Sequence, residues 1–184
     1  MARIVGYIAA SLDGFVADRD DNLDWLTQRQ DIELGEHHYD AFLTRIRTVV
    51  MGRSTYDWLA RQPIAWPYPD QRAIVVTSRP LPDPMGQIEI RSDIDALIDE
   101  LRALDDGDVW MIGGGRLQMS FIERDALDEI EVYVISQLLG GGVPLFPPVG
   151  FARALRLVSA SAQGSGCARL HYVFDRPDAE PGPD

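Results

Sequence analysis

A candidate anion site stands at Gly52, directly after an apolar run that ends at Met51. Arg53, Ser54 and Thr55 follow, and a helix-like segment comes next. The first backbone N–H groups of a helix lack partners and the helix dipole is positive there, so a glycine, a guanidinium and two hydroxyls at this point can hold a phosphate. Capping of the helix by Ser54 or Thr55, with no ligand present, is the alternative.

A second group of glycines has the same setting, at the end of an apolar strand-like run and before a helical pattern. Three successive residues without a Cβ allow a diphosphate to approach the backbone closely, although a tight turn would have the same composition. Two such units in one small domain favour a dinucleotide over a single phosphate. The candidate residues are Ile112, Gly113, Gly114, Gly115, Arg116 and Leu117.

A third strand-like run ends in Thr77, Ser78 and Arg79. A guanidinium can form a bidentate pair with a phosphate and a hydroxyl can donate to it, as a 2′-phosphate on an adenosine ribose requires. This composition favours NADP over NAD. Alternatively, Thr77 and Ser78 open a turn before Pro80, and Arg79 is solvated.

The first strand-like run ends in Ala9 and Ala10, followed by Ser11, Asp13 and Gly14. Small side chains leave room for a planar ring beside the sheet, and Gly14 lets the next loop cross it. A close contact between sheet and helix, followed by an ordinary Asp-Gly turn, explains the same residues.

Apolar runs of strand length recur along the chain and predict about eight strands. The runs are Ile4–Ala10, Thr48–Met51, Ala73–Thr77, Ile88–Ile90, Val109–Ile112, Ile130–Ser136, Leu155–Ala160 and Arg169–Phe174, and the helical patterns are Leu34–Arg47, Tyr56–Ala60, Asp93–Leu104 and Arg116–Glu123. Strands and helices alternate as far as about residue 136, and two strands follow at the end. We therefore expect an α/β fold with a mixed, mostly parallel sheet flanked by helices and a C-terminal antiparallel hairpin.

Length and composition fit one domain, which we expect over residues 1–175, with a mobile tail rich in proline and acidic residues at 176–184. The net charge of −12 argues against binding to nucleic acid or to an anionic membrane. Cys167 is the single cysteine, and His37, His38 and His171 are too few and badly spaced for a zinc centre, so we expect no metal. A cytoplasmic protein without a signal peptide or membrane span is expected.

Four motifs occur in the order found in the dihydrofolate reductase superfamily, namely Ser11-Leu12-Asp13-Gly14, Gly52-Arg53-Ser54-Thr55-Tyr56, Thr77-Ser78-Arg79 and Gly113-Gly114-Gly115. The chain most resembles the branch that contains the C-terminal reductase domain of the bifunctional riboflavin-biosynthesis deaminase-reductase and its stand-alone relatives. The segments at 128–134 and 139–146 are also similar to that branch. The resemblance covers about residues 2–174.

The resemblance implies a dihydrofolate reductase-like fold and a reductase that binds NADPH along one edge of the sheet. It places Gly52, Arg53, Ser54 and Thr55 at phosphates, Thr77, Ser78 and Arg79 near the 2′-phosphate, Gly113, Gly114 and Gly115 under the diphosphate, and Ala10, Ile112, Arg116 and Leu117 beside the cofactor. Hydride would pass to a small substrate above Ala9 and Ala10.

On the substrate side, relatives that resemble dihydrofolate reductase use an acid on the helix before the Gly-Arg motif to relay a proton. Glu36 matches that position, with Asp40 nearby, and Asp13 is a second candidate acid. A carboxyl that faces an apolar pocket would be poised for acid catalysis, whereas a solvated Glu36 in the first turn would merely favour the helix dipole. Trp25 resembles the tryptophan that follows the mobile active-site loop of dihydrofolate reductases.

Two positions depart from the riboflavin-pathway pattern. Tyr7 stands where that branch commonly has a lysine, and Ile112 stands where it has a glutamate. Both changes remove charge from the expected substrate side, where Tyr7 remains a candidate substrate-binding residue.

These observations predict an NADPH-dependent oxidoreductase that transfers a hydride to a small heterocycle, pterin-like or a pyrimidine of the riboflavin-pathway kind. The alternative is a nucleotide-binding module without catalysis, or a degenerate reductase. We also expect a homodimer, with the strand at Ile130–Ser136 as a possible edge for a second copy.

Overall fold

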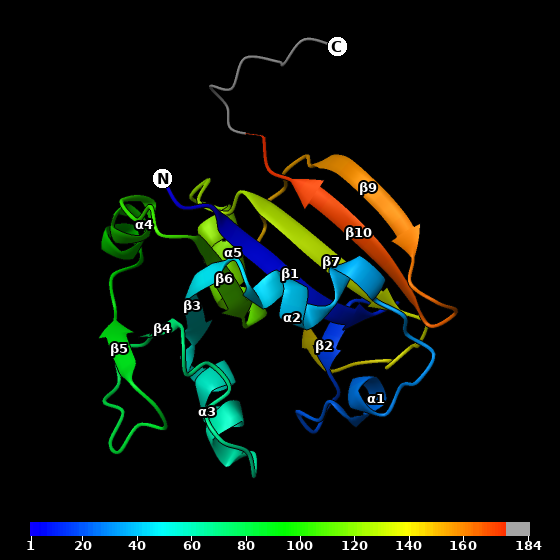
Figure 1. Ribbon diagram of the computed structural model, residues 1–184, viewed down its shortest axis with the longest axis horizontal. Helices are drawn as coiled ribbons and strands as arrows, with labels where there is room; N and C mark the ends of the chain where they lie inside the picture. The colour runs from blue at the N-terminus through cyan, green and yellow to red at the C-terminus, as the bar shows by residue number, and fades with distance from the viewer. Residues whose placement is uncertain (176–184) are drawn as a thin grey trace.

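The computed structural model describes residues 1–175, and the expected tail at 176–184 lies outside the described part. An eight-stranded sheet runs through the molecule in the order β5-β4-β3-β6-β1-β7-β10-β9, with helices on both faces (Figure 1). The strands from β5 to β7 in this order are parallel to one another. β10 runs antiparallel to β7, and β9 runs antiparallel to β10. The strands are β1 Ile4–Ser11, β2 Phe15–Ala17, β3 Ile46–Gly52, β4 Arg72–Val76, β5 Ile88–Arg91, β6 Asp108–Gly113, β7 Glu129–Ile135, β8 Val143–Pro144, β9 Arg156–Ala162 and β10 Cys167–Val173.

The fold class predicted from the sequence is confirmed. Each of the eight apolar runs forms a strand of the main sheet, and the last two form the antiparallel hairpin. Val49, Val50 and Met51 are fully buried because β3 lies inside the sheet and is covered on both faces. The short strands β2 and β8, which we did not expect, pair as a second sheet.

The helices are α1 Asp24–Thr27, η1 Gly35–His37, a 3-10 helix, α2 Tyr39–Leu43, α3 Arg53–Arg61, α4 Ile94–Arg102 and α5 Gly115–Ile122. The single helix that we expected over Leu34–Arg47 is wrong. Gly35 has φ +52° and His38 is extended, which separates η1 from α2, and Ile46 already pairs with Asp108 as part of β3. No helix within residues 1–175 is long and apolar enough to cross a membrane.

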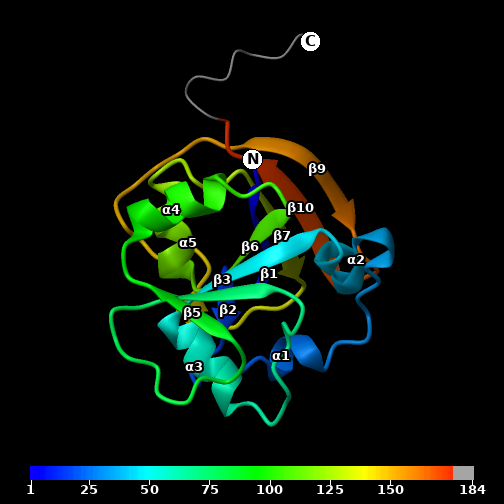
Figure 2. The ribbon, with the colours of Figure 1, turned by 60° about the vertical axis from the view of Figure 1, so that its left-hand side comes forward.

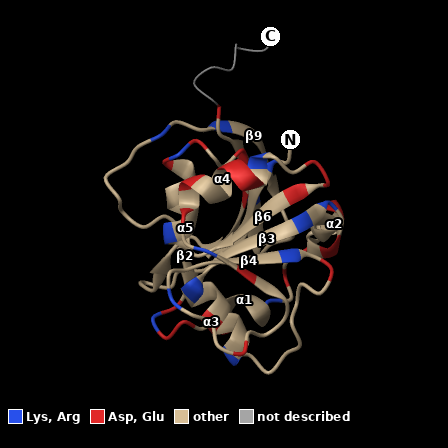
Figure 3. Cartoon of the chain, turned by 90° about the vertical axis from the view of Figure 1, so that its left-hand side faces the viewer, with Lys and Arg blue, Asp and Glu red and all other residues tan. Residues whose placement is uncertain are grey.

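Two layers of helices bury the two faces of the sheet (Figure 2). On one face, Val50 packs with Leu97 of α4 and Phe121 of α5. On the other face, Met51 packs with Leu59 of α3 and with residues of α2. Charged residues gather near strand ends and on α4, whereas the central stretches of β3 and β6 are apolar (Figure 3).

The free edges of the sheet differ from our expectation. β7 is bonded to β1 on one side and to β10 on the other, so Ile130–Ser136 offers no edge to a second copy. Within the described residues, β5 and β9 are the edge strands of the main sheet. The homodimer itself stays a prediction.

Candidate functional site

The predicted phosphate-binding segments meet at one edge of the sheet. Parallel strands end at the same edge, and β3 lies between β4 and β6. Gly52 is in register with Val76, and Met51 with Gly113. A Cβ placed on Gly52 would lie 3.8 Å from the carbonyl oxygen of Gly113. We call this region, with Gly52, Gly113–Gly115 and Thr77–Arg79, the glycine edge.

Two helices begin at the glycine edge without a capping side chain. Gly52 precedes α3 and Gly114 precedes α5, and at neither helix start does a capping side chain accept a hydrogen bond from the first N–H groups. By contrast, α4 is capped by Asp93, which accepts from the second and third following N–H groups. Ser54 and Thr55 lie inside the first turn of α3 rather than at its cap. The first N–H groups of α3 and α5 therefore remain suited to an anion.

The three glycines of the second motif differ in their surroundings. A Cβ on Gly113 would have no atom within 4 Å, so this position leaves open space for a ligand. A Cβ on Gly114 would lie 3.6 Å from the Thr55 hydroxyl, in ordinary contact. On Gly115 it would lie 2.5 Å from the carbonyl oxygen of Leu145. Gly115 thus serves the packing of α5 against the chain after β8.

The residues that flank these glycines point in different directions. Arg116 is exposed. Ile112 packs on the face of α2 and α3, and Leu117 is buried on the opposite face. Leu117 takes part in the helix start through its backbone, whose N–H donates to the Gly114 carbonyl at 3.0 Å.

Nearly every arginine of the described chain already has a partner. Within residues 1–175, only Arg61, Arg79 and Arg116 have a guanidinium without a hydrogen bond or ion pair. Arg79 and Arg116 both lie at the glycine edge, whereas Arg61 lies at the far end of α3. Arg53, which we expected at a phosphate, donates to Asp57 at 2.7 Å and to the Pro80 carbonyl at 3.0 Å.

Thr77 and Ser78 have distinct roles beside Arg79. The Thr77 side chain is buried, and its hydroxyl oxygen accepts from the Arg79 N–H at 3.1 Å. Ser78 and Arg79 are exposed. The turn thus presents one hydroxyl and one unpaired cation to solvent, which is the composition that the sequence predicted for a phosphate contact.

Asp13 fastens two loops at the same edge. Its carboxylate accepts from the Ser11 hydroxyl at 2.7 Å and from the N–H groups of Leu139 and Gly140 at 3.0 and 2.7 Å. The Ser11 hydrogen bond, aided by these N–H groups, lowers the pKa of Asp13 to about 2. Asp13 is ionised at neutral pH and has a structural role, and this geometry does not support our prediction that it delivers a proton.

Ala9 and Ala10 face opposite sides of the sheet. Ala10 is buried toward α4 and α5. Ala9 packs near Tyr7 and Trp25 on the other face. The indole N–H of Trp25 is buried and has no hydrogen-bond partner among residues 1–175. An unpartnered buried donor is uncommon, and this one lies where we expected the substrate.

Tyr7 lies at the wall of a cavity of about 290 Å³. Its ring stacks on Phe42 at 4.3 Å between centroids, and its hydroxyl donates to the His37 carbonyl at 3.1 Å. Burial raises the pKa of Tyr7, so the hydroxyl keeps its proton at neutral pH. Tyr133 lies on the other side, with ring centroids 4.8 Å apart.

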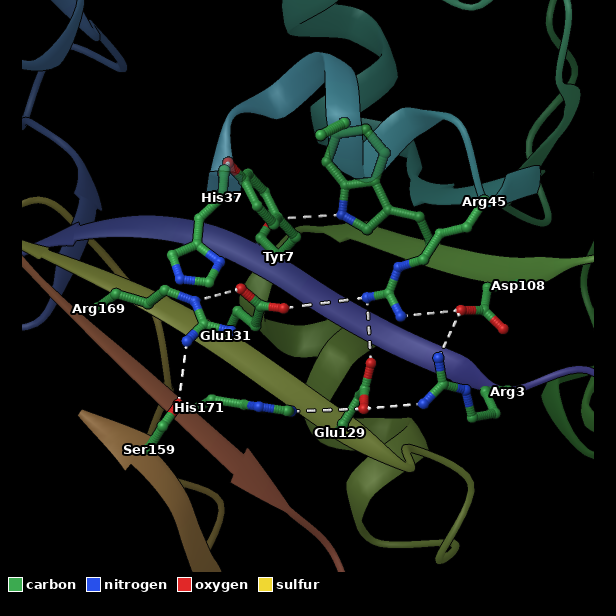
Figure 4. A network of polar contacts seen from close by, with 12 residues as sticks. Arg3, Tyr7, His37, Arg45, Asp108, Glu129, Glu131, Ser159, Arg169 and His171 are labelled. Atoms are coloured by element: carbon green, nitrogen blue, oxygen red, sulfur yellow. Dashed lines mark hydrogen bonds and ion pairs between the residues drawn. The ribbon is translucent and has the colours of Figure 1, made fainter. Parts of the chain in front are cut away.

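Behind Tyr7, a carboxylate and a guanidinium form a buried pair (Figure 4). Arg169 donates to Glu131 at 2.7 Å and to the Ser159 hydroxyl at 3.0 Å, and the Tyr133 hydroxyl donates to Glu131 at 3.0 Å. Burial alone would raise the pKa of Glu131, but the hydrogen bond and charge of Arg169 outweigh it, and the pKa is lowered.

A second carboxylate, Glu129, joins the same group (Figure 4). Arg3 and Arg45 donate to it at 3.2 and 3.1 Å, and both also pair with Asp108 at 3.0 and 3.1 Å. The His171 Nε2 atom lies 3.4 Å from Glu129. We call the set Arg3, Arg45, Asp108, Glu129, Glu131 and Arg169 the acid–arginine network.

This network was not predicted from the sequence. The signal in the sequence is the alternation of Glu129 and Glu131 with apolar residues along β7, and of Arg169 and His171 along β10. A period of two puts such side chains on one face of a sheet. Which cation meets which acid depends on the strand register, which the pattern does not give.

Glu36 and Asp40 are not in the apolar surroundings that we expected. The Glu36 side chain is 88% exposed, at the rim of the cavity, with His37 3.7 Å away. The Asp40 side chain is 84% exposed, 3.5 Å from His38, and does not line the cavity. Burial therefore does not poise either carboxyl for proton transfer in this conformation.

Related proteins cover almost the whole chain. It is 33% identical over 172 residues to the uncharacterized protein YwjB of Bacillus subtilis (strain 168), covering 93% of this chain and 97% of YwjB. It is 26% identical to the uncharacterized protein YyaP of the same organism over 184 residues, covering 94% of this chain and 95% of YyaP.

Solved structures share the fold. A putative riboflavin biosynthesis protein from Shewanella sp. PV-4 has a TM-score of 0.84 and 27% identity, covering 96% of this chain and all of that one. The diaminohydroxyphosphoribosylaminopyrimidine deaminase/5-amino-6-(5-phosphoribosylamino)uracil reductase of Thermotoga maritima has a TM-score of 0.64 and 15% identity, covering 95% of this chain and 57% of that one. The model of the RibD C-terminal domain matches residues 3–168, and the chain belongs to that family.

Proposed function

We propose that this protein is an NADPH-dependent reductase that transfers a hydride to a small heterocyclic substrate. Membership of the RibD C-terminal domain family supports an oxidoreductase in general. The observation that favours NADPH is the exposed, unpaired guanidinium of Arg79 beside the Ser78 hydroxyl, next to two helix starts without capping side chains. A dinucleotide with a phosphorylated ribose satisfies all of these groups together.

Each contact proposed for this cofactor has a group of suitable chemistry in the chain. The first N–H groups of α3 and α5 would bind the diphosphate, with the open space at Gly113 admitting it. Arg79 and Ser78 would bind the 2′-phosphate. When bound, NADPH supplies the hydride, and the protein contributes orientation and electrostatics.

On the substrate side, the face of the sheet at Ala9 has features that suit a flat, polar ring. The buried N–H of Trp25 would donate to such a ring. The cavity at Tyr7 lies on the same face as Ala9 and is lined by aromatic side chains, two histidines and charged groups of the acid–arginine network. We propose that a heterocycle with both a π-face and hydrogen-bonding edges, such as a pterin or a pyrimidine, binds here.

The test compares Arg79→Ala with Arg61→Ala by calorimetric titration of NADPH and NADH. Arg61 is the matched control because its guanidinium is also unpaired but lies at the far end of α3. We expect Arg79→Ala to weaken NADPH binding about tenfold or more, the loss of a charge-assisted bidentate contact, with NADH binding unchanged. Arg61→Ala should bind both cofactors like the wild type.

Two outcomes would contradict the proposal. Wild-type protein that binds neither cofactor below millimolar concentration would rule out the reductase. Equal losses of NADPH binding in Arg79→Ala and Arg61→Ala would show that general charge, rather than a 2′-phosphate contact, decides the affinity.

A nucleotide-binding protein without catalysis is the second candidate, and the candidate acids favour it. Asp13 is held ionised by the loop contacts, and Glu36 is 88% exposed, so neither is a buried acid beside Ala9. The discriminating measurement is NADPH oxidation in the presence of dihydropterin-like and quinonoid acceptors. Tight NADPH binding without turnover of any acceptor would support this candidate over the reductase.

A further inference from the structure

The segment that presents Arg79 is a loop over residues 77–87, which we call the Arg79 loop. It is tied to the sheet at its start, where the Thr77 N–H donates to the Arg91 carbonyl at 2.8 Å. Pro80, Pro82 and Pro84 then remove three backbone donors. Among residues 1–175, no backbone N–H between those of Arg79 and Met85 donates a hydrogen bond, so the loop depends on anchors from elsewhere.

One anchor is the hydroxyl of Tyr56. Tyr56 is buried in α3, and its hydroxyl oxygen accepts from the Met85 N–H at 2.6 Å. Next to Met85, Gly86 packs closely against Trp66: a Cβ on Gly86 would be 2.8 Å from the indole ring. The Tyr56 and Trp66 rings are themselves neighbours, with centroids 6.2 Å apart. Tyr56 thus holds the C-terminal end of the Arg79 loop in place.

The other anchor is Arg53, three residues earlier on the same helix. Arg53 donates to the Pro80 carbonyl at 3.0 Å and is itself held by Asp57 at 2.7 Å. Residues three apart lie on one side of a helix, so a single side of α3 holds both Pro80 and Met85. The same helix begins at Gly52 with free N–H groups. One rigid element therefore sets the distance between the helix-start anion site and Arg79.

We propose that Tyr56 is a positioning residue for cofactor choice: its hydroxyl holds the Arg79 loop at the distance from the α3 start that a 2′-phosphorylated dinucleotide requires. This inference rests on the proposed function. Without the hydroxyl, Met85 loses its acceptor and the loop gains freedom, so Arg79 spends less time at the phosphate. NADH, which has no 2′-phosphate, does not use Arg79 and is unaffected.

The test is Tyr56→Phe in the full chain, which removes one oxygen and keeps the ring. We expect NADPH to bind about three- to tenfold more weakly by calorimetry, with NADH unchanged. The double variant with Arg79→Ala should bind NADPH no more weakly than Arg79→Ala alone, because both changes remove the same contact. Tyr172→Phe is the control, since its hydroxyl has no hydrogen bond within the described chain.

A second measurement separates the loop from the cofactor. Amide hydrogen exchange of the free protein at Met85 and Gly86 should accelerate in Tyr56→Phe and not in Tyr172→Phe. Faster exchange with an unchanged ratio of NADPH affinity to NADH affinity would overturn the positioning role of Tyr56, while the proposed reductase function would stand. Wild-type protein that binds neither cofactor would overturn the proposed function, and with it this inference. Gly86→Ala, whose new Cβ would push the Arg79 loop away from Trp66, should lower the ratio of NADPH affinity to NADH affinity, as Tyr56→Phe does.

Discussion

The glycine edge and the acid–arginine network are two polar regions of this molecule, and their charged groups differ in the partners that they already have. At the glycine edge, Arg79 and Arg116 have no partner within residues 1–175 and two helices start without capping side chains. In the network, Arg3, Arg45 and Arg169 each meet two or more acceptors of the protein itself. Unpaired cations beside two helix starts without capping side chains suit an anionic ligand, whereas the satisfied groups of the network serve the chain's own structure.

Burial explains why Glu131 and Arg169, within the network, must satisfy each other. The side chains of Glu131 and Arg169 are 12% and 8% exposed, so each would be costly without the other. Arg79 is exposed, and water satisfies it until a ligand arrives. An arginine of each region should therefore respond differently to the same substitution.

The largest effect is expected from Arg169→Met. This substitution removes the hydrogen-bonded cation of the Glu131 carboxylate and leaves only Arg45, 3.9 Å away, beside it. Breaking a buried ion pair in this way typically costs about 3–5 kcal/mol of the free energy of unfolding. Arg79→Met is the matched change at the glycine edge and should stay within about 0.5 kcal/mol of the wild type, because the side chain is exposed and unpaired. Urea denaturation at neutral pH measures both.

Two results would break this comparison. A stable Arg169→Met protein would mean that Glu131 finds water or another donor, so that the charges of the network do not depend on one another. A large loss in Arg79→Met would mean that Arg79 supports the fold, and its unpaired guanidinium would no longer point to a ligand.

A smaller effect, within the glycine edge, is expected from Gly115→Ala. The new Cβ would lie 2.5 Å from the Leu145 carbonyl oxygen, and overpacking of this kind costs about 1–3 kcal/mol. Gly52→Ala is the control, because its Cβ meets nothing closer than 3.8 Å. It should lose less stability but bind NADPH more weakly, since the Cβ faces the anion site. Thermal unfolding and cofactor titration of both variants separate packing from binding.

The sequence predicted the architecture because its signals are local. Runs such as Val49–Met51 are continuous and apolar, so they identify interior strands, and parallel topology then brings their ends to one edge. The pairing of Glu131 with Arg169, 38 residues apart, depends instead on the register between β7 and β10. Burial is likewise not local: the resemblance that placed a candidate acid at Glu36 assumed one continuous helix and did not reveal that Gly35 and His38 would interrupt it.

The smallest expected effect concerns Asp13, a satisfied acid that lies at the same edge of the sheet as the glycine edge. Its pKa is lowered from 3.8 to about 2, chiefly by the Ser11 hydroxyl. A lowered pKa in the folded state means that the loop contacts add stability above pH 4 and lose it as the pH falls toward 2. The amide protons of Leu139 and Gly140, followed by NMR, should therefore titrate with a midpoint near pH 2.

Ser11→Ala sharpens the same prediction. Removing the hydroxyl takes away the strongest hydrogen bond to the Asp13 carboxylate, so the pKa of Asp13 should rise and the midpoint at Leu139 and Gly140 should move to higher pH. An unchanged midpoint would show that the two backbone N–H groups alone hold the carboxylate. A midpoint near 4 in the wild type would show that Asp13 does not hold the two loops together. Asp13 would then no longer be an example of a charge satisfied by the protein at this edge.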